Sequence, residues 1–164
     1  MNAPESKIPF PLLPNTSYGG GLYAGRFVLG EDVFGLVAAP ADGGELAATP
    51  WGKAKRVSGA LFYNDGLVNT AAMADAGSTL AQWAQGLRIG GFADWYIPSR
   101  LEALILFGAI GTVGGFAREW HWTSTQYADD AGYAWFQSFY YGHQHYGRKG
   151  SVLRARAVRR FPIR

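Results

Sequence analysis

The centre of the chain reads Gly90-Gly91-Phe92-Ala93-Asp94-Trp95-Tyr96-Ile97-Pro98-Ser99-Arg100-Leu101-Glu102, a glycine pair followed by aromatic residues and then a helix start. Ser99 and Glu102 have the spacing of a capping box, in which each side chain accepts a hydrogen bond from the other residue's backbone N–H. The pattern predicts a helix that begins just after Pro98 and ends near Gly111. Its residues at helical spacing are Leu101, Leu104, Ile105 and Gly108.

A second helix and two groups of strands are predicted around this stretch. Thr79-Leu80-Ala81-Gln82 has the same capping-box pattern and predicts a short helix to about Leu87, after a partly helical, alanine-rich run at 69–77. Strand patterns lie at 22–29, 33–39, 122–127, 133–140 and 152–161, with loops at 40–50, 129–132 and 142–150. Helices in the middle and strands at both ends indicate an α+β fold, with two short helices packed on antiparallel strands, rather than alternating βαβ units.

The composition is that of one folded domain with many turns and many aromatic rings. Glycine accounts for 23 of the 164 residues, aromatic residues for 15% and charged residues for 16%. The chain has no cysteine, which excludes disulfide scaffolds, thiol nucleophiles, thiolate zinc sites and iron–sulfur clusters. The first residues do not resemble a signal peptide, and the apolar uncharged run at 103–117 is too short to span a bilayer. We therefore expect a protein made in the cytoplasm and not exported by an encoded signal.

Residues 1–20 are predicted to form an extended arm, followed by a single domain over residues 21–164. Four of the eight prolines lie in this segment and favour extended backbone: Pro4, Pro9, Pro11 and Pro14. The run Tyr18-Gly19-Gly20-Gly21 is interpreted as a flexible joint. Such an arm either lies along its own domain or docks on a partner, and the sequence leaves both possibilities open.

The C-terminal end is strongly basic, although the net charge of the whole chain is only +3. Seven lysines and arginines, and no acidic residue, lie between Arg148 and Arg164. A basic terminus can bind nucleic acid or another acidic surface. We favour the alternative in which a terminal strand pairs its arginines with carboxylates elsewhere in the fold. One face of that strand carries Leu153, Ala155 and Ala157, and the other carries Arg154 and Arg156.

Sequence signatures of catalysis are absent, and we expect no enzyme activity, cofactor or metal. The chain has no Gly-x-Ser-x-Gly elbow, no phosphate-binding loop and no His-Glu-x-x-His helix. The run 19–24 imitates a dinucleotide fingerprint, but it precedes the first clear strand instead of following one. His143 and His145 lack a third metal ligand, and Asp129 with Asp130 supplies too few oxygen ligands for calcium.

The strongest functional signal is a cluster of aromatic residues. Eleven of the 31 residues from Phe116 to Tyr146 are aromatic, and all three histidines of the chain lie there as well. Strand parity predicts that Trp135 and Phe139 point into the core and that Tyr140 points outward. The run 140–148 contains too many rings and polar groups to be buried, and its composition is typical of a binding surface. The alternative is an exposed loop with no binding role.

Four blocks of the sequence resemble one known family. They are the 90–102 stretch, Trp122-Thr123-Ser124-Thr125-Gln126-Tyr127, Ala134-Trp135-Phe136-Gln137-Ser138-Phe139 and Arg154-Ala155-Arg156-Ala157-Val158-Arg159-Arg160, and they cover about residues 60–162. In this order they resemble the C-terminal domain of the Legionella collagen-like adhesin, a family found in many bacterial and phage proteins. The resemblance implies a C-type-lectin-like fold and a non-enzymatic binding or display role. The insert at 103–120 is shorter than in phage members, and the calcium sugar-site motifs of lectins are absent.

The resemblance also implies which residues form the scaffold and which bind. Some relatives are variable proteins of diversity-generating retroelements, in which the segment that changes the ligand corresponds here to about residues 133–148. By that analogy Trp122, Trp135, Phe139 and the terminal arginine strand are scaffold. The implied ligand contacts are Ser138, Tyr140, Tyr141, His143, His145, Tyr146 and Arg148.

These features lead to two hypotheses about function. The first is a phage virion protein, on a tail or head appendage, that attaches to a host-surface protein or glycan through the aromatic run 140–148. The second is a structural decoration or adaptor protein of the phage capsid or tail, whose N-terminal arm and aromatic faces bind other virion subunits. A homo-oligomer fits either hypothesis, whereas nucleic-acid binding is the disfavoured interpretation.

Overall fold

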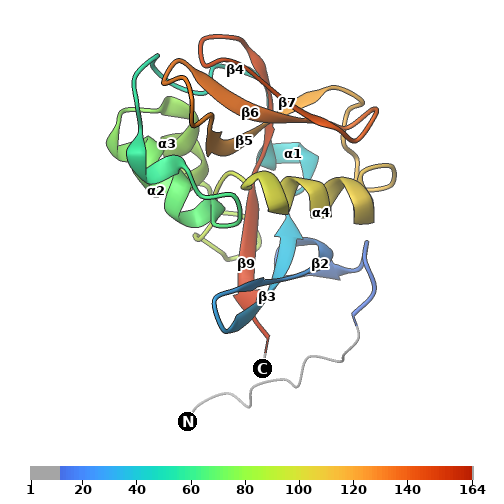
Figure 1. Ribbon diagram of the computed structural model, residues 1–164. Helices are drawn as coiled ribbons and strands as arrows, with labels where there is room; N and C mark the ends of the chain where they lie inside the picture. Colours follow the sequence, from blue (N-terminus) through green and yellow to red (C-terminus); the bar gives the residue numbers. More distant parts are fainter. Residues whose placement is uncertain (1–11, 164) are drawn as a thin grey trace.

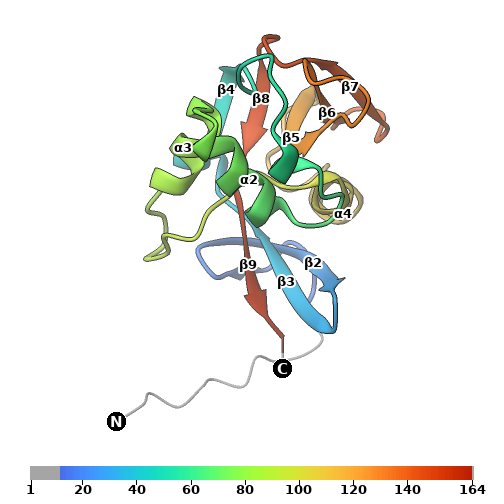
Figure 2. The same ribbon diagram turned by 60° about the vertical axis from the view of Figure 1, so that its left-hand side comes forward.

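The fold is a mixed α+β arrangement of two sheets and several helices (Figures 1 and 2). The computed structural model describes residues 12–163. In Figure 1 one sheet lies below and the other above, with helix α4 (Arg100–Ile110) between them. The α+β class predicted from the sequence is confirmed. Across residues 12–163, no helix is long and apolar enough to cross a membrane.

The smaller sheet has four antiparallel strands in the order β1-β2-β3-β9. They are β1 (Ser17–Tyr18), β2 (Gly21–Leu29), β3 (Asp32–Ala38) and β9 (Val158–Pro162), and the strands predicted at 22–29 and 33–39 pair as the antiparallel β2 and β3. The predicted flexible joint is instead the tight turn between β1 and β2, and the Tyr18 ring packs 4.9 Å from that of Phe161. The predicted arm is therefore part of the sheet from β1 onward, and its residues 1–11 lie outside the described chain.

The larger sheet has five strands in the order β4-β8-β5-β6-β7. They are β4 (Glu45–Thr49), β5 (Trp120–Gln126), β6 (Tyr133–Ser138), β7 (Gln144–Arg148) and β8 (Leu153–Arg156), and only β5 and β8 pair in parallel. The single strand predicted at 152–161 is in fact two strands, because the chain passes from one sheet to the other at Ala157. The loops predicted at 40–50 and 142–150 are also wrong in part, since β4 and β7 are the edge strands of this sheet.

The structure contains more helical segments than the two expected. Besides α4 they are the single turn α1 (Ala41–Gly44), the 3-10 turn η1 (Ser58–Ala60), α2 (Gly66–Asp75) and α3 (Thr79–Gly86). The capping residue of α3 is Ser78 and not Thr79, because the Ser78 hydroxyl accepts a hydrogen bond from the Ala81 N–H at 3.2 Å. The capping box of Ser99 and Glu102 is confirmed.

Helix α4 is covered on more than one side. It contacts β2 of the smaller sheet and both β5 and β6 of the larger sheet. The residues that it buries fully are therefore not the predicted series, since Leu101, Leu104 and Ile105 are only partly buried. The fully buried residues are Glu102, Ala103, Leu106 and Ile110.

Glu102 is a carboxylate with no exposed surface at the start of α4. Its Oε1 accepts hydrogen bonds from the N–H groups of Gly66 (2.9 Å) and Ser99 (3.1 Å), and its Oε2 accepts one from the Tyr96 hydroxyl. Burial, with the adjacent carboxylate, raises the pKa of Tyr96 well above its usual value, so the hydroxyl stays protonated and donates. Tyr96 in turn exchanges two backbone hydrogen bonds of 2.8 Å with Val158. One carboxylate thus joins the starts of α2 and α4 to strand β9.

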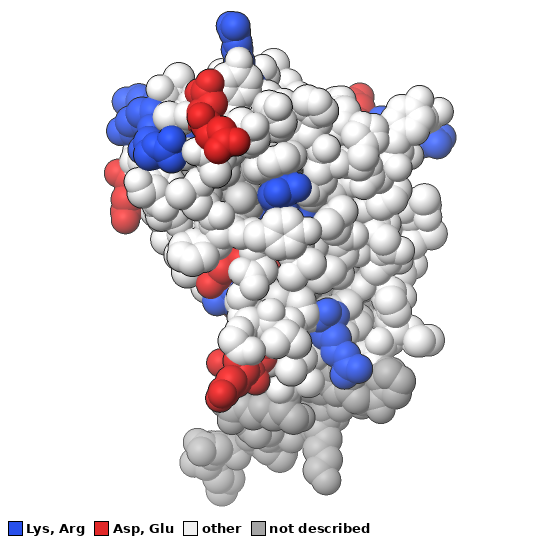
Figure 3. Space-filling view, in the orientation of Figure 1, with Lys and Arg blue, Asp and Glu red and all other residues white. Residues whose placement is uncertain are grey.

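The arginines of the C-terminal strands are paired with carboxylates, as the sequence analysis predicted. Arg159 donates two hydrogen bonds to Asp94, at 2.8 and 3.1 Å, and Arg160 donates one to Asp65 at 2.9 Å. On the face shown in Figure 3, acidic and basic side chains lie near one another, and wide areas between them carry no charge. The basic terminus is therefore used within the fold and does not by itself indicate a nucleic-acid partner.

Lys149 is a fully buried lysine. Its Nζ donates hydrogen bonds to Gln126 Oε1 and to the Lys55 carbonyl, both at 2.7 Å, and lies 4.5 Å from the centre of the Trp51 ring. Burial, with the nearby positive charge of Arg56, lowers the pKa of Lys149 to about 8. The folded chain therefore releases this proton at a lower pH than the unfolded chain does.

We predict that Glu102→Ala lowers the free energy of unfolding by at least about 3 kcal/mol, because three buried donors lose their acceptor. Glu102→Gln keeps an oxygen for the Gly66 and Ser99 N–H groups and offers its amide to Tyr96, so we expect less than half of that loss. Urea denaturation of both variants measures the difference. Equal losses would show that these hydrogen bonds do not carry the stabilisation.

We also predict that the free energy of unfolding rises between about pH 8 and about pH 9.5. In this range the unfolded chain, with a lysine pKa of about 10.4, binds a proton that folded Lys149 has released. The rise is at most about 1.4 kcal/mol per pH unit for one proton. Urea denaturation at each pH tests it, and Lys149→Met should remove it. A rise that persists in the variant would assign the effect to other groups.

Candidate binding site

Residues 138–142 form a tight turn that presents two tyrosines to solvent. The Ser138 hydroxyl accepts hydrogen bonds from the backbone N–H groups of Tyr140 (3.2 Å) and Tyr141 (2.9 Å). Gly142 has a φ of 86°, and a Cβ at this position would collide with the ring of Phe107 in α4. The turn therefore holds Tyr140 and Tyr141 outward, with 47% and 74% of their surfaces exposed.

Phe139 holds the turn onto the core. Its ring stacks on Phe116, with centroids 4.4 Å apart and an interplanar angle of 2°. Its backbone N–H donates a hydrogen bond to the Glu119 carbonyl at 3.1 Å. The prediction that Phe139 is buried is confirmed, and the stacked rings fix the point from which the two exposed tyrosines begin.

Two glutamine amides, from buried Gln137 and half-buried Gln144, connect the turn to the start of α4. Gln137 Nε2 donates hydrogen bonds to the carbonyls of Ser138 (3.0 Å) and Gly142 (2.8 Å). Gln144 Nε2 donates to Gln137 Oε1 at 3.0 Å, and Gln144 Oε1 accepts from Arg100 Nε at 2.9 Å. The backbone of the turn is therefore tied to the first residue of α4 through two glutamine side chains.

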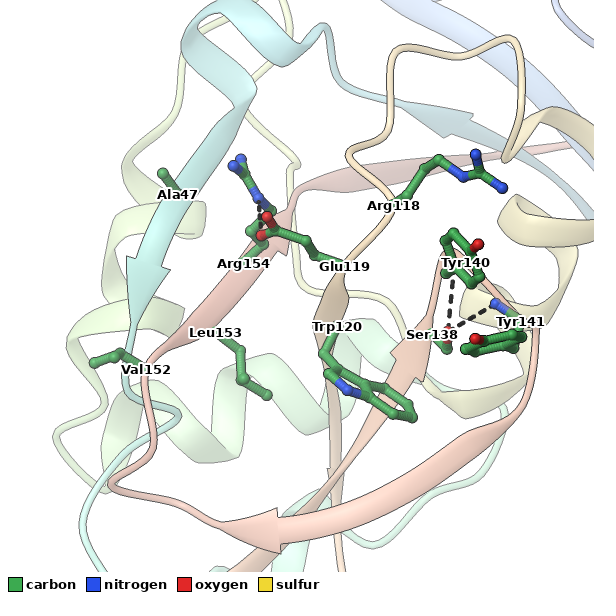
Figure 4. A pocket seen from close by; sticks show the side chains of 10 residues that line it. All are labelled: Ala47, Arg118, Glu119, Trp120, Ser138, Tyr140, Tyr141, Val152, Leu153 and Arg154. Atoms are coloured by element: carbon green, nitrogen blue, oxygen red, sulfur yellow. Dashed lines mark hydrogen bonds and ion pairs between the residues drawn. The ribbon is translucent and has the colours of Figure 1, made fainter.

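Tyr140 and Tyr141 line a hollow of about 540 Å³ on the larger sheet (Figure 4). In Figure 4, Trp120 of β5 lies between these tyrosines on one side and the Arg154–Glu119 pair on the other. A volume of this size falls within the range of small-ligand sites in proteins, ~300–1,000 Å³. The remaining lining residues are Ala47, Arg118, Ser138, Val152 and Leu153.

Four neighbouring rings form what we call the aromatic rim: Trp120, Tyr140, Tyr141 and His143. Ring centroids are 4.4 Å apart for Tyr140 and Tyr141, 5.9 Å for Tyr141 and His143, and 5.1 Å for His143 and Trp120. Each ring combines a flat apolar face with a polar atom at its edge. Three of the predicted contact residues, Tyr140, Tyr141 and His143, thus lie together.

The two arginines of the hollow have different electrostatic surroundings. Arg154 donates to Glu119 at 2.7 Å and lies 3.6 Å from Glu45, and the hydrogen bond to Glu119 raises its pKa. Burial opposes the ionisation of Glu45, but its basic neighbours hold the pKa of this carboxyl below the usual value. Arg118 instead lies over the Tyr140 ring at 4.2 Å, and within residues 12–163 it forms no ion pair.

The other predicted contact residues lie in different places. Ser138 borders the hollow, but it is buried and its hydroxyl is engaged by the turn, so we interpret it as a residue that positions the tyrosines. His145 is exposed on β7, and its Nδ1 accepts a hydrogen bond from the backbone N–H of the next residue, Tyr146, at 2.9 Å. Arg148 borders a separate hollow beside Tyr133. In the described part of the chain, no group of three or more His, Asp or Glu residues is placed to hold a metal ion.

Tyr146 belongs to a second aromatic cluster. Its ring stacks on Tyr127, with centroids 3.9 Å apart, and meets the ring of Trp135 edge-on at 5.2 Å. Trp135 is only partly buried, and the Arg100 guanidinium lies 3.6 Å from the centre of its ring. The prediction that Trp135 points into the core is wrong. The neighbouring residue Ala134 is part of the core, whereas the Trp135 ring packs against Arg100, the first residue of α4.

A third exposed apolar surface is formed by the residues between η1 and α2 and by the first turn of α2. The Asn69 side chain pairs with both the N–H and the C=O of Phe62, at 3.1 and 2.8 Å, and so fixes the local backbone. Arg100 lies 5.0 Å from the Tyr63 ring and connects this surface to the second aromatic cluster. We call it the apolar segment 61–68, after its exposed residues Leu61, Phe62, Tyr63, Leu67 and Val68.

Four of the residues that shape the hollow are not among the contacts predicted from the sequence: Arg118, Glu119, Trp120 and Arg154. Trp120 lies in the aromatic-rich region, and this was the sequence signal that could have identified it. It was missed because β5 begins two residues before the predicted strand at 122–127. No spacing in the sequence marks Arg118. It reaches the hollow only because the chain that follows α4 passes beside the turn that carries Tyr140.

Together the fold and the site define an α+β protein with an open, aromatic-lined hollow on its larger sheet. No protein-family model matches the chain, and a search of curated proteins gives no match. The C-type-lectin-like assignment therefore stays a prediction from the four sequence blocks, and the functional argument depends on the geometry of the hollow.

Proposed function

We propose that this chain is a non-enzymatic binding protein of a phage virion, which attaches the particle to a host-surface molecule through the aromatic rim. The observation that carries the proposal is the hollow of about 540 Å³, where Tyr140 and Tyr141 are held by a fixed turn and still face solvent. Aromatic side chains on a fixed backbone supply contact area with little loss of conformational freedom on binding.

The polar groups of the hollow favour binding over catalysis. The Ser138 hydroxyl accepts two backbone hydrogen bonds, and the Glu119 carboxylate accepts one from Arg154. A nucleophilic serine needs a neighbouring base that takes its proton. In this site the hydroxyl and the carboxylate are each engaged in holding the structure.

The phage context comes from the resemblance of the four sequence blocks. The mixed α+β fold is compatible with a C-type-lectin-like domain. Two of the blocks also occupy central positions, since 90–102 leads into α4 and 154–160 crosses between the two sheets. By this resemblance the protein is made in the host cytoplasm and becomes part of the virion.

A structural decoration or adaptor protein is the second candidate, and the apolar segment 61–68 favours it. Single exposed apolar residues are ordinary on protein surfaces, but here five lie within eight positions of the chain, which concentrates apolar surface there. Such a patch suits contact with another virion subunit. The contribution proposed for the N-terminal arm falls largely on residues 1–11, outside the described chain.

We predict that Tyr140→Ser combined with Tyr141→Ser reduces binding to host cells by at least about tenfold, since one central tyrosine can contribute ~2 kcal/mol or more. The melting temperature should change by only a few degrees, because both rings are exposed and the turn depends on Ser138 and Gly142. Binding of the labelled protein to host cells and thermal unfolding measure the two effects.

Phe62→Ser combined with Leu67→Ser is the matched comparison, because it removes exposed apolar surface elsewhere. It should leave attachment to cells intact. If the tyrosine variant attaches normally while the Phe62 and Leu67 variant fails to incorporate into particles, the attachment proposal is wrong and the decoration function is favoured.

A further inference from the structure

We infer that the hollow takes an acidic saccharide, whose sugar ring lies on the aromatic rim and whose anionic group pairs with Arg118. This inference rests on the proposed attachment function and names the class of ligand for the same site. The anionic group is a carboxylate or a phosphate ester, because a guanidinium presents paired N–H donors that match the oxygens of either.

Arg118 is held in place and has its donors available. Its guanidinium lies 4.2 Å from the centre of the Tyr140 ring, and stacking of this kind uses the face of the guanidinium and leaves its N–H edge exposed. Among the described residues it has no carboxylate partner. Figure 4 shows its side chain beside Tyr140 and away from the Arg154–Glu119 pair. Arg118 also borders a second hollow, of about 420 Å³, so it is open from two directions.

The other charges of the hollow do not cancel that of Arg118. Glu119 is the acidic residue of the lining, and it is already engaged by Arg154 at 2.7 Å. Arg154 also lies 3.6 Å from Glu45, so its charge is largely compensated within the fold. One uncompensated positive charge therefore remains at the edge of the hollow, beside the rings.

The rings and the size of the hollow suit a sugar. A pyranose has an apolar C–H face and polar edges, and the lining offers both kinds of surface. Apolar contact is available on Trp120, Tyr141 and Leu153, while the tyrosine hydroxyls and the Trp120 indole can form hydrogen bonds at the edges. A hollow of about 540 Å³ accommodates a short saccharide.

The test is calorimetric titration of the full chain with two matched pairs of probes. The first pair is trigalacturonate and its methyl ester, and the second is galactose 6-phosphate and galactose. We expect at least one acidic probe to bind about tenfold or more tightly than its neutral counterpart, and the pair that responds identifies the anionic group.

Two arginine variants localise the effect. Arg118→Gln should bring the acidic and neutral affinities to within about threefold of each other. Arg26→Gln should leave the ratio unchanged, because Arg26 is an exposed arginine on β2, in the other sheet, and has no ion pair within residues 12–163. Thermal unfolding confirms that both variants are folded.

Each outcome separates the inference from the proposed function. The inference is overturned if the protein binds acidic and neutral probes with equal affinity. It is also overturned if Arg118→Gln and Arg26→Gln reduce the preference for the acidic probe equally. A third outcome is that no probe binds while the Tyr140 and Tyr141 double variant still loses attachment to host cells. The inference is then wrong, but the proposed function stands, and the ligand is a surface protein or another glycan. If that double variant attaches normally, the proposed function itself fails.

Discussion

The buried carboxylate of Glu102 fixes how the helices and sheets of this protein meet. It accepts hydrogen bonds from the Gly66 and Ser99 N–H groups and from the Tyr96 hydroxyl, while Tyr96 bridges to Val158 in β9. A carboxylate is tolerated in an interior only when donors satisfy its oxygens, and burial still raises the pKa of this one. Two of its donors lie at the starts of α2 and α4, and the third, Tyr96, pairs through its backbone with Val158 of β9. The two helix starts and the C-terminal strand are therefore held in one arrangement.

The same helix start supports the candidate binding surface. Arg100 follows the capping serine directly and donates to Gln144, and Gln144 donates to Gln137, which holds the carbonyls of the turn at 138–142. The two exposed tyrosines therefore extend from a backbone that is tied to the core on one side and stacked on it through Phe139 on the other. A surface that is organised before its ligand arrives spends less of the binding energy on ordering.

Local patterns in the sequence predict the parts of the fold that neighbouring residues determine. The capping box at Ser99, the strands β2 and β3 and the exposed tyrosines are of this kind. The edge strands β4 and β7 are missed because they are short and rich in small or polar residues, which weakens the alternation. Parity identifies which residues of β6 share a face but not which face is covered, so Trp135 is misplaced. Arg118 reaches the hollow because segments that are distant in the sequence pack together, and the spacing of residues in the sequence does not predict such packing.

Amide hydrogen exchange, measured by NMR at low denaturant concentrations, tests most directly whether the core is centred on Glu102. The N–H groups of Gly66 and Ser99 should exchange only through global unfolding, with the same free energy and denaturant dependence as the most protected amides. The N–H groups of Tyr140 and Tyr141, in the exposed turn, should exchange through smaller openings. Exchange of Gly66 and Ser99 at free energies well below that of global unfolding would contradict the account.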